Sequence, residues 1–556
     1  MTIDAKTLGR PDTSGGASTR VPRLTWAEVV ALSSLVAIGT VARMHGFTGL
    51  DVWFDDAWAA APARVGLSSA VHMFLTAPGY GLALRSWIRL DPATTWFAQL
   101  PAFVLGLTAI PAMFALLRFF RSPRWVAVSG AAIVAVGPLL VQYSARLKEY
   151  PFDFLAACVV LWLAERVRRT PSSGALGALA LSSVAVFFVS AGTVPVLVGA
   201  WLALCVAVPA DRAARKRLIV ALLGVALGCA TVWAALLRHL PHVLTANWRR
   251  RGFLVDYGSL GALERSITLV FGGFVHAALA VPVPVTFFNT APGFHSAGVA
   301  LLGIMVLGVA AGYPIASSIS RSAAVPSLGA GLTLLAAVAL AFLDRVPLGD
   351  GRTDEVLYPA LLVGLAAAVV AVAGRLGGRV HLTRAARLTL AAVALAGAIV
   401  FGASHRAVYP TVSLRGVAAQ LAPLERGGDV VFVDTFNSFG WCYYELSLCH
   451  TRVGGHPVWP QGFRPVSTSP STFIASHYRV PLPEFTVAQA RARRIWYVGF
   501  TYGTFDVGTD PARYNLPVAT WFTGLLARDG WRPALAGPST QVLGTHAYAI
   551  LYVRAG

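Results

Sequence analysis

Residues 98–117 read AQLPAFVLGLTAIPAMFALL, an apolar run that contains no charged side chain. A membrane-spanning helix needs about 20 mainly apolar residues, and this run is long enough. Arg118, Arg121 and Arg124 follow it directly. The stretch therefore predicts a membrane helix that ends in a basic loop, and comparable stretches recur along the chain.

The whole chain has the composition of a polytopic membrane protein. Its 556 residues are 56% hydrophobic and 13% charged, whereas soluble domains carry about 25% charged residues. This excludes a soluble enzyme, a disordered tail and a disulfide scaffold. Eleven apolar windows predict spans, at 26–43, 98–117, 125–143, 151–165, 173–191, 193–209, 218–237, 297–316, 327–343, 356–374 and 386–403. Prolines and glycines interrupt a further apolar stretch, 266–288, where we expect a juxtamembrane element or a twelfth span.

The net charge of +20 follows the predicted topology. With the N-terminus in the cytoplasm, every predicted inner loop is basic, which is the usual orientation signal. Much of the charge therefore reports orientation, and we expect no nucleic-acid partner. Arginine greatly outnumbers lysine, which we interpret as the mark of a GC-rich, bacterial genome. The predicted location is a bacterial plasma membrane.

Three segments divide the chain. We expect residues 1–25 to form a polar cytoplasmic tail before an uncleaved first span, and residues 26–404 to form the transmembrane module. We expect residues 405–556 to lie outside the cell, and they predict a small α/β domain, because strand-like runs alternate with helical stretches. The strand-like runs are 429–434, 495–500 and 547–553, and the helical stretches are 484–494 and 520–529.

The first outer loop, residues 44–97, contains two adjacent carboxylates, Asp55 and Asp56, in the sequence WFDDAW. A desolvated carboxylate beside a like charge has a raised pKa, which suits a general base acting on a sugar hydroxyl. The alternative is that Asp55 caps a helix starting at Ala57. Asp51 and Tyr80 of the same loop are further candidates for substrate binding.

The second outer loop packs four charges between two apolar spans, in the sequence YSARLKEYPFD at 143–153. Charges at membrane depth are costly and tend to mark sites. Arg146 and Lys148 could hold a phosphate, and Tyr150 could donate a hydrogen bond to it. The alternative is a loop whose charges pair internally through Glu149. The chain has only two other lysines, Lys6 and Lys216, which favours a function for Lys148.

Two more outer loops carry candidate residues. The fifth, Asp344–Arg352, has glycines that permit tight turns and an Arg352 that could face an anion; a solvated turn is the alternative. The fourth, residues 238–296, contains the basic and aromatic pair Trp248 and Arg249. This pair could contact a saccharide, although contact with membrane lipids is the better interpretation.

The sequence contains few motifs for metal binding or thiol chemistry. The sequence has no HExxH, CxxC zinc pair or Walker loop, so we predict no required cofactor and no metal site. A divalent cation at the acidic loop is the alternative. Cys442 and Cys449 lie in the outer segment, where oxidation is allowed, and predict a disulfide; two buried thiols are the alternative.

These motifs resemble those of bacterial GT-C membrane glycosyltransferases of the protein O-mannosyltransferase-like and aminoarabinose-transferase-like kind (glycosyltransferase family 39). WFDDAW is similar to their W-[FY]-D-E-A pattern, with Asp56 where the pattern has Glu. Tyr143–Asp153 is similar to a Y-x-x-E-L-K-x-Y-x-x-D loop, with Arg146 in place of the acid. Pro347–Arg352 resembles a P-[FL]-G-x-G-R loop. The stretch from Ala77 to Gly81 resembles H-P-P-L-Y-Y, with Thr76 in place of His.

The resemblance implies a GT-C-like transmembrane module and a sugar transfer at the outer membrane face. The donor would be a polyprenyl-phosphate sugar, and the acceptor a hydroxyl of a cell-envelope glycan, lipid or protein. Asp55 or Asp56 would act as the base, and Lys148, Tyr150 and Arg352 would stabilise the departing phosphate. Asp153 would line the same site. The transfer would invert the anomeric centre and would move a hexosyl or pentosyl group.

Three other functions remain open from the sequence. A transporter or flippase of lipid-linked glycans should have polar residues along several spans, and most span interiors here are nearly free of charge. A non-catalytic membrane scaffold should tolerate neutralisation of its outer-loop carboxylates. A polymerase or ligase of lipid-linked glycans is close in chemistry, but it gives no reason for the carboxylate pair.

Overall fold

The computed structural model describes most of the helical part of the chain and much of the C-terminal part. The described residues are 24–47, 52, 54–64, 67, 70, 77–91, 94–207, 212–237, 248, 254–279, 297–320, 327–349, 353–377, 414–434, 437, 440–441, 443, 452–453, 456–457, 472–474, 483–500, 517–534, 541–543 and 547–554. The predicted span 386–403 lies outside these residues.

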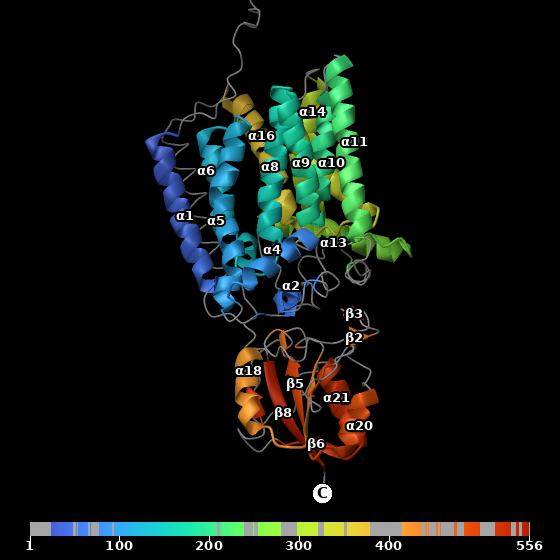
Figure 1. The fold of residues 1–556 in the computed structure, drawn as a ribbon. Helices are drawn as coiled ribbons and strands as arrows, with labels where there is room; N and C mark the ends of the chain where they lie inside the picture. Colours follow the sequence, from blue (N-terminus) through green and yellow to red (C-terminus); the bar gives the residue numbers. More distant parts are fainter. Residues whose placement is uncertain are drawn as a thin grey trace, which may run out of the picture.

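A bundle of apolar helices forms the larger part of the molecule (Figure 1). The other ten predicted windows all fall on its helices. These are α1 (Trp26–Phe47), α5 (Thr95–Phe119), α6 (Arg124–Val136), α7 (Pro138–Tyr143), α8 (Tyr150–Arg169), α9 (Ser173–Val189), α10 (Val194–Ala207), α11 (Arg212–Ala235), α14 (Ala297–Ser320), α15 (Leu328–Phe342) and α16 (Tyr358–Gly377). Within the described residues, five segments are long and apolar enough to cross a membrane: Trp26–Met44, Thr95–Phe119, Arg212–Ala235, Ala300–Ile319 and Thr353–Ala373. The chain is thus a helical membrane protein.

One predicted window, 125–143, differs in detail from the structure, and the predicted break between 173–191 and 193–209 falls at Ser190. The window 125–143 is not one helix, because the chain turns at Gly137 and α7 starts at Pro138. Proline lacks the backbone N–H that a continuous helix needs, which explains the break. Between α9 and α10, Ser190 ends one helix and caps the short helix η3 (Ala191–Thr193) by accepting the Gly192 N–H. Both breaks lie at the end of the bundle where α8 begins.

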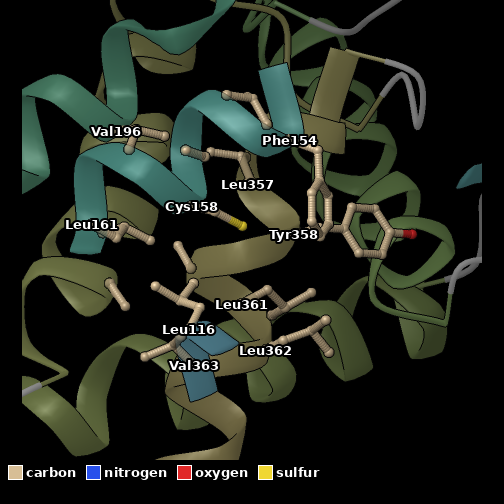
Figure 2. Close-up of a cluster of buried hydrophobic side chains, with 14 of the residues drawn as sticks. Leu116, Phe154, Cys158, Leu161, Val196, Leu357, Tyr358, Leu361, Leu362 and Val363 are labelled. Atoms are coloured by element: carbon tan, nitrogen blue, oxygen red, sulfur yellow. The ribbon is translucent and has the colours of Figure 1, made fainter. Parts of the chain in front are cut away.

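Small residues allow close approach of the helix backbones. A Cβ added to Gly199 of α10 would clash with the backbone of Thr333 in α15, and one on Gly364 of α16 would clash with Ala310 in α14. Such small-residue contacts replace the hydrophobic driving force that helices lack in lipid. Figure 2 shows the core that results, with Phe154 and Cys158 of α8 close to Leu357 and Leu361. The short helix η6 (Thr353–Leu357) therefore sits directly against the start of α8.

Three further helices lie at one end of the bundle. The helices α2 (Phe54–Ala60) and α4 (Pro78–Ile88) form part of the predicted first outer loop, and η2 (Ala61–Arg64) continues α2. The third, α13 (Leu260–Leu279), covers the first part of the interrupted stretch 266–288. It lies across the ends of the bundle helices in Figure 1.

A mixed sheet forms the second part of the molecule, beyond α2 and α4 (Figure 1). Its strand order is β4-β1-β5-β8-β6, and β7 also pairs with β8. The three central predicted strands are confirmed as β1 (Asp429–Val433), β5 (Arg494–Phe500) and β8 (Ala547–Arg554). The strands β1, β4 (Thr472–Ile474) and β5 are parallel, whereas β8 is antiparallel to β5, β6 (Trp531–Pro533) and β7 (Gln541–Leu543). A separate hairpin pairs β2 (Arg452–Val453) with β3 (His456–Pro457).

The two faces of this sheet bury different partners, because side chains alternate along a strand. Phe432 and Tyr497 face α20 (Pro483–Arg491) and α21 (Pro517–Arg528), where Phe432 stacks on Phe522 with ring centroids 4.3 Å apart. Val431 and Trp496 face the other way, toward α18 (Leu414–Leu421), which leads through η7 (Ala422–Leu424) to β1. That second core continues into Val52, Ala57 of α2 and Leu84 of α4. The sheet is therefore packed onto the predicted first outer loop.

Candidate functional site

Two segments that lie about 90 residues apart in the sequence meet at Asp56. The Asp56 Oδ2 accepts a hydrogen bond from Arg146 Nη1 at 3.1 Å, and its Oδ1 accepts the backbone N–H of Leu147 at 3.0 Å. Asp56 is 1% exposed and Arg146 is 3% exposed. The first and second predicted outer loops are thus joined by a buried ion pair.

The short segment between α7 and α8 supplies the basic side of this cluster. It runs from Ser144 to Glu149, and the rings of Tyr143 and Tyr150 at its two ends pack edge to face, 4.9 Å apart. Arg146 and Lys148 are both buried, and Lys148 also acts electrostatically on Asp56. The expected alternative, in which this loop pairs its own charges, does not account for the carboxylate that Arg146 binds.

Asp56 is held between opposing electrostatic effects. Burial raises the pKa of the Asp56 carboxyl, while the charges of Arg146 and Lys148 and the two hydrogen bonds oppose that rise. A buried carboxylate with a bound guanidinium keeps a fixed orientation and avoids the full cost of an isolated charge. The arrangement therefore provides an oriented carboxylate whose basicity exceeds that of a solvated one.

Two more buried carboxylates lie close by, from α8 and η6. Asp153 stands in the first turn of α8, where Ser190 hydrogen-bonds its carboxylate. Glu355 of η6 is 1% exposed, and neither of its carboxylate oxygens has a hydrogen-bond partner in the described part of the chain. Glu355 interacts electrostatically with Asp153, a like charge, and with Arg43, an opposite one. An unpartnered buried carboxylate is costly, which makes Glu355 a candidate for contact with a ligand.

Arg43 of α1 is the third cation of the cluster, and no sequence motif predicted it. It is fully buried and donates hydrogen bonds to Ser144 Oγ at 3.0 Å and to the carbonyl oxygens of Val134 at 3.0 Å and Ala135 at 2.8 Å. These carbonyls belong to the last turn of α6, where a cation is favourable. Arg43 therefore joins α1, α6 and the α7–α8 segment behind the carboxylates.

Tyr80 of α4 completes the group. Its phenol is half-buried, and removal from water raises the pKa of Tyr80 well above 10, with nearby negative charges adding to the rise. Those charges belong to Glu149, Asp56 and Asp153. Tyr80 is therefore a neutral hydrogen-bond donor that faces the acidic groups. We call these eight residues the acid–base cluster: Arg43, Asp56, Tyr80, Arg146, Lys148, Glu149, Asp153 and Glu355.

The other predicted site residues are distributed as follows. Asp55 lies in α2 beside Asp56, and Trp248 is half-buried. The side chain of Asp55 and the residues Asp51, Arg249, Arg352, Cys442 and Cys449 lie outside what the structure describes. In the fifth predicted outer loop, Gly349 has a φ of +88° and its N–H is donated to the Asp354 carboxylate at 3.0 Å. That amide is therefore engaged within the loop rather than directed at an anion.

Glu149, Glu355 and Arg43 extend the site beyond the residues chosen from the sequence. Glu149 and Glu355 had a detectable signal, because each is an acid next to an apolar window. Glu355 stands between the glycine-rich loop and Tyr358. Arg43 gave a weak signal, because a basic residue near the end of a span usually reaches toward the membrane surface.

The described residues contain no group of three or more His, Cys, Asp or Glu side chains arranged to hold a metal ion. The side chain of Asp55, in the acidic loop, lies outside those residues.

No protein-family model and no curated protein matches this chain. Among solved structures, it is similar to the Archaeoglobus fulgidus oligosaccharyltransferase in complex with zinc and sulfate, with a TM-score of 0.50 and 12% identity over 90% of this chain and 71% of that one. The chain therefore shares the fold of this oligosaccharyltransferase. ArnT from Cupriavidus metallidurans bound to undecaprenyl phosphate also aligns, with a TM-score of 0.48 and 14% identity over 93% of this chain and 97% of that one.

Proposed function

We propose that this protein transfers a sugar from a polyprenyl-phosphate donor to an acceptor hydroxyl at the outer face of a bacterial plasma membrane. The observation that carries the proposal is the buried pair of Asp56 and Arg146 inside the acid–base cluster. It combines an oriented base with cations that can stabilise a leaving phosphate. The fold shared with an oligosaccharyltransferase supports this class of reaction.

The acidic residues of α2 take the acceptor's proton in this proposal. Asp56 or Asp55 accepts it as the hydroxyl oxygen attacks the anomeric carbon, and Arg146 holds Asp56 in place. Arg146, which the sequence assigned to the donor phosphate, is thereby a positioning residue, because its Nη1 is bonded to Asp56. A single in-line displacement through an oxocarbenium-like transition state inverts the anomeric centre.

Lys148, Tyr150 and Arg352 receive the donor phosphate in the proposal. Negative charge builds on that phosphate as the glycosidic bond breaks, and preorganised donors stabilise it. With cationic side chains in this role, the reaction needs no metal. The oligosaccharyltransferase structure is a complex with zinc, so a divalent cation at the acidic loop is the alternative.

The proposed topology has the donor and the acceptor on the outer side of the membrane. We propose eleven spans, a cytoplasmic segment 1–25, a transmembrane module 26–404 and an extracytoplasmic segment 405–556 that contains the sheet. The polyprenyl tail lies between spans, and the acceptor is a cell-envelope glycan, lipid or protein. A hexosyl and a pentosyl donor both fit these expectations.

Transport and scaffolding are weaker alternatives. A transport pathway needs polar groups along the membrane interior. In the described bundle, the buried charges lie near helix ends: Arg43, Asp153 and Glu355 at one end, and Glu28 and Glu165 at the other. A scaffold gives no reason for the buried and unpartnered Glu355.

The test is sugar release or transfer from a panel of labelled polyprenyl-phosphate sugars, with crude membrane acceptors, in nanodiscs. Wild type is compared with Asp55→Asn/Asp56→Asn and with Asp529→Asn, an exposed carboxylate on the sheet segment. Turnover of one donor by wild type and Asp529→Asn, lost in the double variant, supports the proposal and names the sugar. If no donor turns over or binds, the transferase proposal is wrong.

A further inference from the structure

A second site lies at the opposite end of the bundle from the acid–base cluster. The ends of α8 and α10 and the starts of α9 and α11 enclose a cavity of about 50 Å³. Apolar side chains such as Val167, Leu176 and Leu218 form most of its wall. Three polar side chains complete the lining: Arg168, Ser172 and Arg217. A smaller cavity, also lined by Arg168 and Leu204, lies between α8, α10 and α15.

Among the described residues, the basic side chains around this cavity outnumber the carboxylates. Arg168 is bonded through Nε and Nη2 to the two carboxylate oxygens of Glu165, both at 2.7 Å. Arg217 is exposed and has no ion pair or hydrogen bond among the described residues. Arg212, Arg215 and Lys216 crowd the same first turns of α11, which contain no acidic residue. Cations at a helix N-terminus are unfavourable, and Asp211, which directly precedes α11 in the sequence, is one carboxylate against these four basic residues.

The cavity also faces the lipid. Only 11% of the apolar window of α11 is buried, so this helix stands at the edge of the bundle. Ile219 and Leu223, just beyond the cavity, are 50% and 64% exposed. An apolar recess that is open to lipid and rimmed by arginines matches a phospholipid, whose phosphate can pair with Arg217 while its chains follow α9 and α11.

We infer that this cavity, the α8–α11 cavity, is a binding site for one anionic phospholipid. The site is separate from the proposed transfer reaction and does not depend on it. Its ligand has two chemical parts, a headgroup with net negative charge and acyl chains that cover the apolar wall. A zwitterionic lipid satisfies only the second part.

Native mass spectrometry of the delipidated protein tests this site, with palmitoyl-oleoyl phosphatidylglycerol and the matching phosphatidylcholine as probes. The variants are Arg217→Ala and its matched control Arg215→Ala, which removes an equal charge from the same helix outside the cavity. We expect wild type and Arg215→Ala to retain one phosphatidylglycerol in preference to phosphatidylcholine. Arg217→Ala should bind it about fivefold more weakly, since one basic residue near a lipid surface contributes about that factor.

A second variant tests the apolar part of the site. Ala214→Trp adds a large side chain to the cavity wall while leaving every charge in place, and should abolish retention of the lipid. Equal binding by Arg217→Ala and Arg215→Ala, or no preference for phosphatidylglycerol over phosphatidylcholine, would overturn the assignment. So would complete displacement of the lipid by excess inorganic phosphate, because the site would then recognise the anion alone.

Discussion

The two ends of the helix bundle differ in whether a buried glutamate has hydrogen-bond partners. At one end, Glu165 is 4% exposed and receives hydrogen bonds from Arg168 and Arg169, which are only three and four residues further along α8. At the other end, Glu355 is as deeply buried but has no hydrogen-bond partner in the described residues. The hydrogen bonds of Glu165 are satisfied within one helix, whereas the carboxylate of Glu355 needs a ligand or a proton.

The distance along the sequence between partners also differs. Glu165 finds its partners within one turn, as side chains three or four residues apart on a helix do. In the acid–base cluster, Asp56 is paired with Arg146 across 90 residues. Long-range pairing requires several helices to be in place first. The folded bundle, and not a local segment, therefore creates this cluster, as expected of a site and not of a helix end.

The largest expected effect comes from breaking the pair at the cluster end. Asp56→Asn should lower transfer by about 10²- to 10⁴-fold, the usual contribution of a general base. It should also destabilise the protein by about 3–5 kcal/mol, because the buried Arg146 loses its ion pair with Asp56. Transfer kinetics and thermal unfolding in the same detergent measure the two effects.

A double variant separates these two effects. Asp56→Asn/Arg146→Gln removes both charges and should regain most of the lost thermal stability, while transfer stays low. Recovery of transfer in the double variant would show that Asp56 acts only through the fold.

Substitution of the unpartnered carboxylate, Glu355, should have the next largest effect. Glu355→Gln removes a carboxyl group whose charge is disfavoured by burial and by Asp153 more than it is favoured by Arg43, so stability should be unchanged or higher. Transfer should fall by about tenfold or more, corresponding to at least 1.4 kcal/mol of lost transition-state binding. Parallel unfolding and kinetic measurements distinguish the outcomes, since a structural role for Glu355 predicts that stability and transfer fall together.

The pH dependence of transfer sharpens the assignment of Arg146. Burial raises the pKa of Asp56, and Arg146 and Lys148 counteract this rise. A base must be deprotonated, so transfer should decline on the acid side at a higher pH than for a solvated carboxylate. Arg146→Gln removes one counteracting charge and should move this acid limb further upward. A pH–rate profile with an unmoved acid limb would argue against Arg146 as the residue that positions the base.

The sequence was informative where a charge stands out against an apolar background. Asp56, Arg146, Lys148 and Asp153 are recognisable because they flank predicted spans, and the structure brings them to one end of the bundle. The central strands were predictable for a similar reason, since runs such as DVVFVD at 429–434 have few alternatives. In both cases the local pattern alone carries the information.

Other features depend on packing that no local pattern reveals. Arg43 is recognisable only once α1 lies against the end of α6, where the carbonyls of Val134 and Ala135 accept its hydrogen bonds. Glu355 is recognisable as part of the cluster only through its electrostatic interaction with Asp153, which lies some 200 residues earlier in the chain. The break before α7 was readable in principle from Pro138, but the hydropathy of the window 125–143 conceals it.

The smallest expected effect comes from a substitution at the other end of the bundle, where the carboxylate of Glu165 already has its partners. Glu165→Gln removes the acceptor of Arg168 and Arg169, whose side chains are 23% and 16% exposed and can turn toward water or lipid headgroups. The loss of stability should therefore be about 1 kcal/mol or less, as for partly exposed ion pairs, and transfer should equal that of wild type. Thermal unfolding and donor turnover of this variant provide the measurement. A large loss of transfer without unfolding would mean that the two ends are coupled through α8, because Asp153 and Glu165 lie on the same helix.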